Sequence, residues 1–185
     1  MIQTYYTLMR YIILFFSFLF LAEPNAWAQH KGSKGPDISG IKTQFLAIDA
    51  KRKSYTQYTT PTQEAGMAFI GFYEGKSLKM LNCNYYQDLG QTEADHYYSG
   101  NTVILVYSKD SEYEESIKTN PRTKLKNTTE NWYYFNKETL IKWVSGAKVI
   151  DSSSEAFKAK QVAFTKEFSA NKKRFADQST LLKIK

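Results

Sequence analysis

Few side chains in this sequence could carry out acid–base or thiol chemistry. Histidine is the usual proton shuttle near neutral pH, and the chain has two, His30 and His96. The single cysteine, Cys83, lies on a segment that we expect to pair with the segment of His96, so that a thiolate beside an imidazole could act as a nucleophile. The competing interpretation is that both fill the core, because a lone cysteine in an apolar strand is usually there for packing.

Two carboxylates close to His96 offer a second way to build an acid–base site. Glu93 and Asp95 are near it in the sequence, but neighbouring residues of a strand point to opposite faces, so His96 and Asp95 cannot easily meet. We therefore predict no catalytic residue. The alternative is a hydrolase-like enzyme that uses His96 with Cys83 or with a nearby carboxylate.

One dense acidic group lies at the start of a long polar segment, residues 110–130, and a basic group follows it. The acidic residues are Asp110, Glu112, Glu114 and Glu115, and the basic ones are Lys118, Arg122, Lys124 and Lys126. The acidic group lacks the glycine and the final bidentate glutamate of a calcium-binding loop, so we interpret the segment as solvated charges. The sequence also has no phosphate-binding loop, no HExxH and no serine-elbow motif. We predict no metal site and no cofactor.

Aromatic residues are the remaining lead to a function, since the chain has 14 tyrosines and 12 phenylalanines. Tyrosines on a sheet face can stack on sugars or hold a peptide. We expect Tyr85, Tyr97, Tyr98 and Tyr133 to contribute to such a face. The same residues would serve equally as ordinary cross-strand pairs.

The N-terminal region has the layout of a secretory signal peptide. A polar region ends at Arg10, an apolar run that contains Ser17 covers residues 11–22, and a small-residue pattern ends at Ala28. The run is shorter than the roughly 20 residues that span a bilayer, although an uncleaved anchor is the alternative. We predict a signal peptide over 1–28 with cleavage after Ala28, a flexible spacer over 29–37, one domain over 38–175 and a tail over 176–185.

Charge and cysteine content fit an exported domain that is stabilised by packing. The net charge is +7 and one cysteine cannot form an internal disulfide. Outside the cytoplasm the anionic partners are lipid head groups, polysaccharides and acidic proteins. We expect a periplasmic or secreted protein with no nucleic-acid partner, whose partner is an envelope protein, a glycan or an anionic membrane surface.

Two amphipathic helices are expected to position these residues. Apolar residues at helical spacing predict a helix over residues 38–54. A second helix, over residues 153–175, is predicted by a capping box of Ser152 and Glu155 and by a phenylalanine stripe. The stripe consists of Phe157, Phe164, Phe168 and Phe175, and the opposite face carries Lys158, Lys166, Lys172 and Lys173.

Three similar segments between these helices predict β-hairpins. In each, an aromatic-rich run meets a polar turn, and a run rich in Leu, Ile or Val follows. We place strands at 66–73, 77–85, 91–98, 102–109, 131–135 and 139–144, with Phe72 opposite Leu78 and Trp132 opposite Trp143. The expected fold is α+β: an antiparallel six-stranded meander of three hairpins, twisted or partly rolled, with one N-terminal and one C-terminal amphipathic helix.

These segments also carry a family resemblance. The helix pattern I-x-x-x-F-x-x-I and the hairpins FYEGKSLKM, HYYSGNTVILVY and WYYFNKETLIKWV resemble a family of small exported bacterial proteins of uncharacterised function, over roughly residues 41–149. The resemblance implies export and the hairpin fold, and it implies no activity. The leading hypothesis is a non-enzymatic envelope or secreted binding module that uses the aromatic face or residues 110–130. Besides the hydrolase, a second alternative is a basic protein that binds membrane surfaces through the lysines of the last helix.

Overall fold

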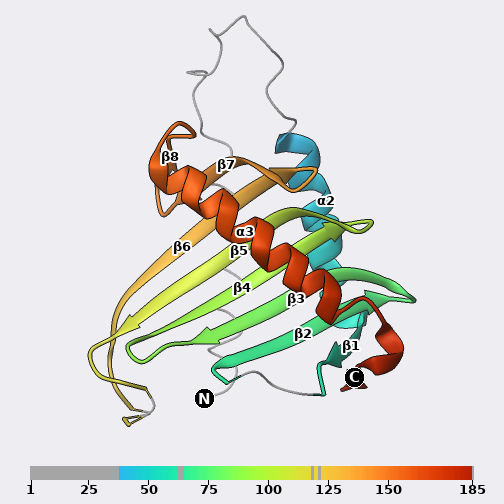
Figure 1. The fold of residues 1–185 in the computed structure, drawn as a ribbon, viewed down its shortest axis with the longest axis horizontal. Helices are drawn as coiled ribbons and strands as arrows, with labels where there is room; N and C mark the ends of the chain where they lie inside the picture. The colour runs from blue at the N-terminus through green and yellow to red at the C-terminus, as the bar shows by residue number, and fades with distance from the viewer. Residues whose placement is uncertain (1–37, 62–64, 118, 121, 185) are drawn as a thin grey trace, which may run out of the picture. The chain divides into compact units, whose positions relative to one another are not determined.

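An antiparallel sheet organises the described part of the chain, and a helix packs against each of its faces (Figure 1). The computed structural model describes residues 38–61, 65–117, 119–120 and 122–184, which belong to the unit Pro36–Lys185. The expected signal peptide, its cleavage site at Ala28 and the spacer lie outside the described residues. No helix of the described residues combines the length and apolar character needed to cross a membrane.

Nine strands follow one another across the sheet in the order β8-β7-β6-β5-β4-β3-β2-β1-β9. Only the last neighbour, β9 beside β1, breaks the chain order. The strands are β1 Thr56–Thr59, β2 Met67–Glu74, β3 Ser77–Tyr86, β4 Gly90–Ser99, β5 Thr102–Tyr113, β6 Leu125–Asn136, β7 Thr139–Ser145, β8 Lys148–Ile150 and β9 Leu182–Lys183.

The prediction of a six-stranded meander was therefore wrong. The three additional strands, β1, β8 and β9, are four residues long or shorter, which is too short for a pattern of alternating apolar and polar residues to show. Strand β9 lies within the segment expected to form a tail and pairs with β1 through Leu182 and Thr59. Strands β5 and β6 also run into the polar segment 110–130, which lies between the strands expected at 102–109 and 131–135.

The three central hairpins, β2–β3, β4–β5 and β6–β7, share one irregularity. Each has a two-residue turn with a left-handed residue at its first position, namely Gly75, Gly100 and Lys137, as the right-handed twist of the flanking strands requires. Two residues before each turn begins, the pairing register shifts between adjacent aromatic residues. These pairs are Phe72/Tyr73, Tyr97/Tyr98 and Tyr134/Phe135.

This repeated β-bulge contributes to the error in the expected cross-strand pairs. A bulge adds one unpaired residue to one strand, so every pair beyond it moves by one position. Phe72 lies opposite Met80, two positions beyond the expected Leu78, because the first turn also has two residues instead of the expected three. Trp132 lies opposite Val144 rather than Trp143. The two tryptophans consequently pack on different faces: Trp143 on the α3 side and Trp132 on the α2 side.

Helix α2, Ile38–Ala50, covers one face of the sheet. Its apolar residues pack against a buried cluster that includes Phe72, Met80 and Tyr97. Phe45 makes edge-to-face ring contacts with Tyr97 and Trp132. The helix ends before the expected residue 54, because residues 52–54 form a separate 3-10 turn.

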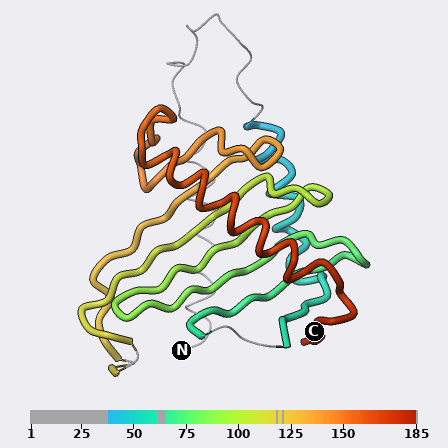
Figure 2. Tube along the Cα trace, in the orientation of Figure 1, coloured from blue at the N-terminus to red at the C-terminus, as the bar shows by residue number. Residues whose placement is uncertain are grey.

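Helix α3, Glu155–Arg174, crosses the other face diagonally (Figure 2). All four phenylalanines of the expected stripe are buried there, between 2% and 7% exposed, and each contributes about 1.5–3 kcal/mol by leaving water. The N-cap is Ser154 and not the expected Ser152. The Ser154 hydroxyl accepts a hydrogen bond from the backbone N–H of Phe157. Asp151 accounts for the difference, because its carboxylate accepts the backbone N–H of Ser153 and so forms a turn just before the helix.

Candidate functional site

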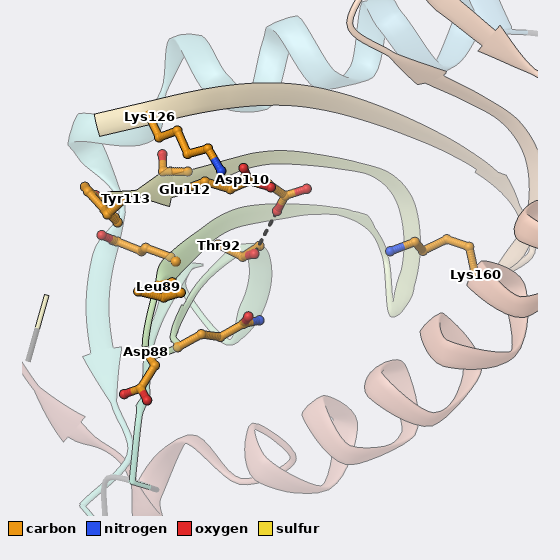
Figure 3. Close-up of a pocket in the computed structure, with 12 residues that line it drawn as sticks. Asp88, Leu89, Thr92, Asp110, Glu112, Tyr113, Lys126 and Lys160 are labelled. Carbon is orange, nitrogen blue, oxygen red and sulfur yellow. Dashed lines mark hydrogen bonds between the residues drawn. The ribbon is translucent and has the colours of Figure 1, made fainter. Parts of the chain in front are cut away.

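A polar hollow opens on the α3 side of the sheet, beyond the part that α3 covers. Residues 87–92 of the β3–β4 turn and β4, residues 110–113 of β5, Lys126 and Lys160 line a space of about 720 Å³, within the usual range for small-molecule sites. Figure 3 shows Lys160 pointing in from α3, while Lys126 lies beside Asp110 and Glu112. The lining combines carboxylates, amides, hydroxyls and two ammonium groups, so the hollow suits a polar occupant.

Asp110 is the most firmly positioned polar group of the hollow. Its Oδ1 accepts a hydrogen bond of 2.7 Å from the Thr92 hydroxyl, and its Oδ2 accepts one of 2.8 Å from Asn131 Nδ2. The buried Asn131 is held in turn by Trp143, whose Nε1 donates to Asn131 Oδ1 at 3.1 Å. This chain of bonds fixes the carboxylate before any ligand arrives, which lowers the entropic cost of binding.

Lys160 lies against aromatic rings, and its charge also acts on Glu167. Its Nζ lies 5.6 Å from the ring centre of Tyr133 and 5.7 Å from that of Trp143, distances at which a ring face attracts a cation. The ammonium group is thereby held at the rim of the hollow, where α3 meets the sheet. It can approach an acceptor on a ligand from the side opposite Lys126.

The four tyrosines proposed from the sequence do not form a common exposed face. Tyr97, Tyr98 and Tyr133 are 5% exposed or less, and Tyr85 is partly buried. Tyr97 belongs to the core on the α2 side, whereas the other three pack on the α3 side. Burial raises the pKa of Tyr97, Tyr98 and Tyr133 above the usual value, which keeps these phenols neutral.

Cys83 and His96 do come together, beneath α3. The pairing of Leu81 with His96 and of Cys83 with Ala94 makes the two side chains diagonal neighbours on one face. Both are fully buried. Glu167 reaches them from α3: its Oε1 lies 3.2 Å from His96 Nε2. The sequence patterns did not select Glu167, although its place one residue before the buried Phe168 puts it at the border of the apolar stripe.

The carboxylates that precede His96 in the sequence lie elsewhere. Asp95 points to the α2 face, where Arg52 donates to both of its oxygens at 2.9 and 3.3 Å. Asn82 adds a third bond to the same carboxylate. Asp95 therefore has a structural role, and Glu93 is exposed, so neither is a partner for His96.

The electrostatics of the buried group favour a positive charge on the imidazole. Burial opposes the charged form of His96, but the facing Cys83 and Glu167 outweigh burial and raise the pKa of His96 to about 10. Burial alone would raise the pKa of the Glu167 carboxyl. Its contact with the His96 imidazole and the hydrogen bond from Tyr85 act in the opposite direction and lower this pKa overall. Tyr85 donates to Glu167 Oε1 at 2.6 Å, and burial together with Cys83 and Glu167 raises the pKa of Tyr85.

The acidic run 110–115 is split by the structure. Asp110 and Glu112 belong to β5 and line the hollow, while Glu114 and Glu115 follow the strand. Glu115 accepts a bond from Asn120 and so helps to close the loop after β5. The four carboxylates are thus not gathered around one point.

Comparison with known proteins adds no relative. No protein-family model matches the chain, and neither a curated protein nor a solved structure matches it.

Proposed function

We propose that this protein is a non-enzymatic binding protein and that the polar hollow is its ligand site. The observation that carries the proposal is the fixed Asp110 carboxylate, held by Thr92 and Asn131 at the wall of a hollow of about 720 Å³. Preorganised polar groups in a concave site are what distinguish a ligand site from an ordinary surface depression.

The chemistry of the lining favours a small polyhydroxylated ligand, such as a mono- or oligosaccharide. The lining holds three carboxylates, Asp88, Asp110 and Glu112, and two ammonium groups, Lys126 and Lys160. Their charges nearly cancel, which suits an uncharged ligand. Carboxylates accept from hydroxyl groups and lysines donate to them. This ligand class matches the glycan among the partners expected from the sequence.

Export is part of this proposal, and it is supported by the sequence pattern of residues 1–28. The family of small exported bacterial proteins, which the hairpins resemble, points in the same direction. Mass spectrometry of the protein from its native host tests it: a chain beginning at Gln29 is expected, and an intact chain beginning at Met1 would contradict it.

Saccharide binding is tested by calorimetry and by thermal shift with a panel of neutral mono- and oligosaccharides. We expect Asp110→Asn and Thr92→Val to weaken binding at least about tenfold, because the loss of one hydrogen bond to a charged group costs about 1.5–3 kcal/mol. The matched control is Glu93→Gln, which changes an exposed carboxylate on the neighbouring strand outside the lining. Binding that Asp110→Asn leaves intact would move the site elsewhere, and a panel without any binder would contradict the ligand class.

The buried Cys83 is separate from this site. A thiol hydrolase needs a substrate carbon within about 3–3.5 Å of the sulfur, and Cys83 has no exposed surface. The membrane-surface alternative is weakened because two lysines of α3 are occupied: Lys158 bonds Glu155 at 2.8 Å and Lys172 bonds Glu138 at 2.9 Å. Salt-sensitive binding to anionic vesicles would revive that alternative.

A further inference from the structure

Three side chains of metal-ligand type meet between α3 and the sheet. Cys83 of β3, His96 of β4 and Glu167 of α3 place one ligand atom each within 4.8 Å of one another. Cysteine and histidine are fully buried, whereas the Glu167 side chain is 27% exposed. The group therefore combines a sealed interior with one ligand that solvent reaches.

His96 is incompletely satisfied in this setting. Its Nε2 forms an ion pair with Glu167 Oε1 at 3.2 Å, whereas its Nδ1 is buried and has no hydrogen-bond partner among the described residues. An unsatisfied buried polar group destabilises the fold, so each one calls for an explanation, of which a bound ion is one. Its neighbours here are a sulfur and a carboxylate oxygen, which are acceptors for a cation.

We propose that Cys83, His96 and Glu167 bind one zinc ion. A thiolate, an imidazole and a carboxylate together form a ligand set that zinc accepts, and three protein ligands leave a fourth position for water. With zinc–ligand bonds of about 2.0–2.3 Å, tetrahedral ligand atoms lie about 3.3–3.7 Å apart. The observed 3.2 Å between His96 Nε2 and Glu167 Oε1 is close to this spacing. The distances from Cys83 Sγ to these two atoms are at most 4.8 Å, so binding would draw the three ligand atoms together.

Neighbouring residues hold the three ligands in place, as outer-shell partners do in metal sites. Tyr85 donates to Glu167 at 2.6 Å. The buried Asn171 directs its amide Nδ2 at Cys83 Sγ, 3.9 Å away, and Arg174 in turn donates to Asn171 Oδ1 at 2.7 Å. An N–H group directed at the sulfur also fixes the orientation of the Cys83 side chain.

Zinc at this position would join β3, β4 and α3 through one ion. Cys83 is the chain's only cysteine, so the sulfur cannot form an internal disulfide. Binding would release the thiol proton and any proton on the imidazole to solvent. The metal would thereby replace a buried His96–Glu167 ion pair with coordinate bonds.

The test uses the full chain, stripped of metal by a chelator and kept under a phosphine reductant. We expect one equivalent of Zn²⁺ to bind and to raise the melting temperature. Co²⁺ should give a thiolate-to-cobalt charge-transfer band that Zn²⁺ abolishes. Glu167→Gln keeps the size of a partly exposed side chain, and we expect it to weaken Zn²⁺ binding at least about tenfold. Cys83→Ser should remove the charge-transfer band.

The matched control is Lys166→Gln, an exposed neighbour of Glu167 on α3, which should bind both metals as the unchanged chain does. Three results would each overturn the proposal: no charge-transfer band from a chain whose circular dichroism shows it to be folded, a band that persists in Cys83→Ser, or equal Zn²⁺ affinity in Glu167→Gln and Lys166→Gln. Saccharide binding in the hollow is measured separately, so either proposal can fail alone.

Discussion

Truncation of Phe168 to alanine is the sharpest test of how α3 is held on the sheet. The Phe168 ring is 2% exposed and lies between Phe135, at 5.1 Å, and Phe164, at 5.4 Å between ring centres. Its edge also faces the His96 ring at 5.8 Å. Surrounding side chains relax only partly around a truncated core residue, so the variant combines the lost transfer free energy with a cavity.

We expect Phe168→Ala to lower the free energy of unfolding by about 3–5 kcal/mol, a large share of the total of about 5–15 kcal/mol of a typical domain. Urea unfolding followed by tryptophan fluorescence measures it, because Trp143 packs against the α3-side core and Trp132 against the α2-side core. The measurement is made with chelator present, so that metal binding does not contribute. The midpoint should fall while the slope stays unchanged.

Phe45→Ala on the opposite face is the matched control. Phe45 also contacts two rings, Tyr97 at 4.8 Å and Trp132 at 5.7 Å, but it is only partly buried. Its truncation should therefore cost about half as much as that of Phe168, since less surface leaves water there. A loss for Phe168→Ala below about 1 kcal/mol, or below that of Phe45→Ala, would refute the reasoning that the phenylalanine stripe holds α3 on the sheet.

Three smaller predictions concern single contacts. Burial, and secondarily Tyr58, raises the pKa of Tyr73 from 10.0 to about 12, so the stabilisation that comes from keeping this phenol neutral is complete below pH 10 and is lost as pH rises to 12. Over this pH range the unfolding free energy of Tyr73→Phe, measured in urea, should fall by about 2–3 kcal/mol less than that of the unchanged chain. The same fall in both proteins would contradict this prediction. Gly71→Ala would place a Cβ 2.9 Å from the Tyr73 ring and 3.0 Å from the Phe175 ring. The crowding should lower the free energy of unfolding by about 1–3 kcal/mol and the melting temperature with it. An unchanged melting temperature would show that the two rings move aside without cost. Ser154→Ala removes the N-cap bond to the backbone of Phe157, which should cost about 1 kcal/mol by urea unfolding, while Ser152→Ala should cost nothing measurable.

Long periodic patterns in the sequence were sufficient to locate α3 and the central strands. The spacing of Phe157, Phe164, Phe168 and Phe175 marks one face of a helix, and all four are buried. The hairpins were visible because each has a polar turn between two apolar runs. Strand β1 was missed because its four residues, TQYT, have no apolar period and Pro61 follows them closely.

The pairing register could not be predicted because the bulges leave no periodic signal. In the third hairpin the bulge moves Lys142, rather than Ile141, opposite Tyr134. Two consecutive apolar residues, Leu140 and Ile141, then face different cores. A regular pairing without a bulge places Trp132 opposite Trp143, which is a favourable cross-strand pair. The bulge shifts the register by one residue, so Trp143 lies opposite Tyr133 instead.

The sequence did contain a signal for the polar hollow. On one face of β4 and of β5, the residues change from apolar to polar along the strand. On β4, Tyr98, His96 and Ala94 are buried under α3, and Thr92 on the same face lies in the hollow. On β5, Val106 is likewise buried and Asp110 opens to the hollow. Both strands thus change from apolar to polar with an unbroken period of two, which indicates a face that is only partly covered.

This change along the strands also explains why the ionisable residues cluster where they do. The long strands β3 to β6 extend beyond the diagonal path of α3 (Figure 1), so the helix edge crosses them at an angle. Lys160 of α3 lines the hollow, and Glu167 of the same helix bonds Tyr85 and His96 on the sheet. Side chains at such a border can keep a charge partly solvated while they reach buried partners such as His96. The proposed zinc site thus lies where α3 covers the sheet, and the proposed saccharide site lies where the same strands extend beyond the helix.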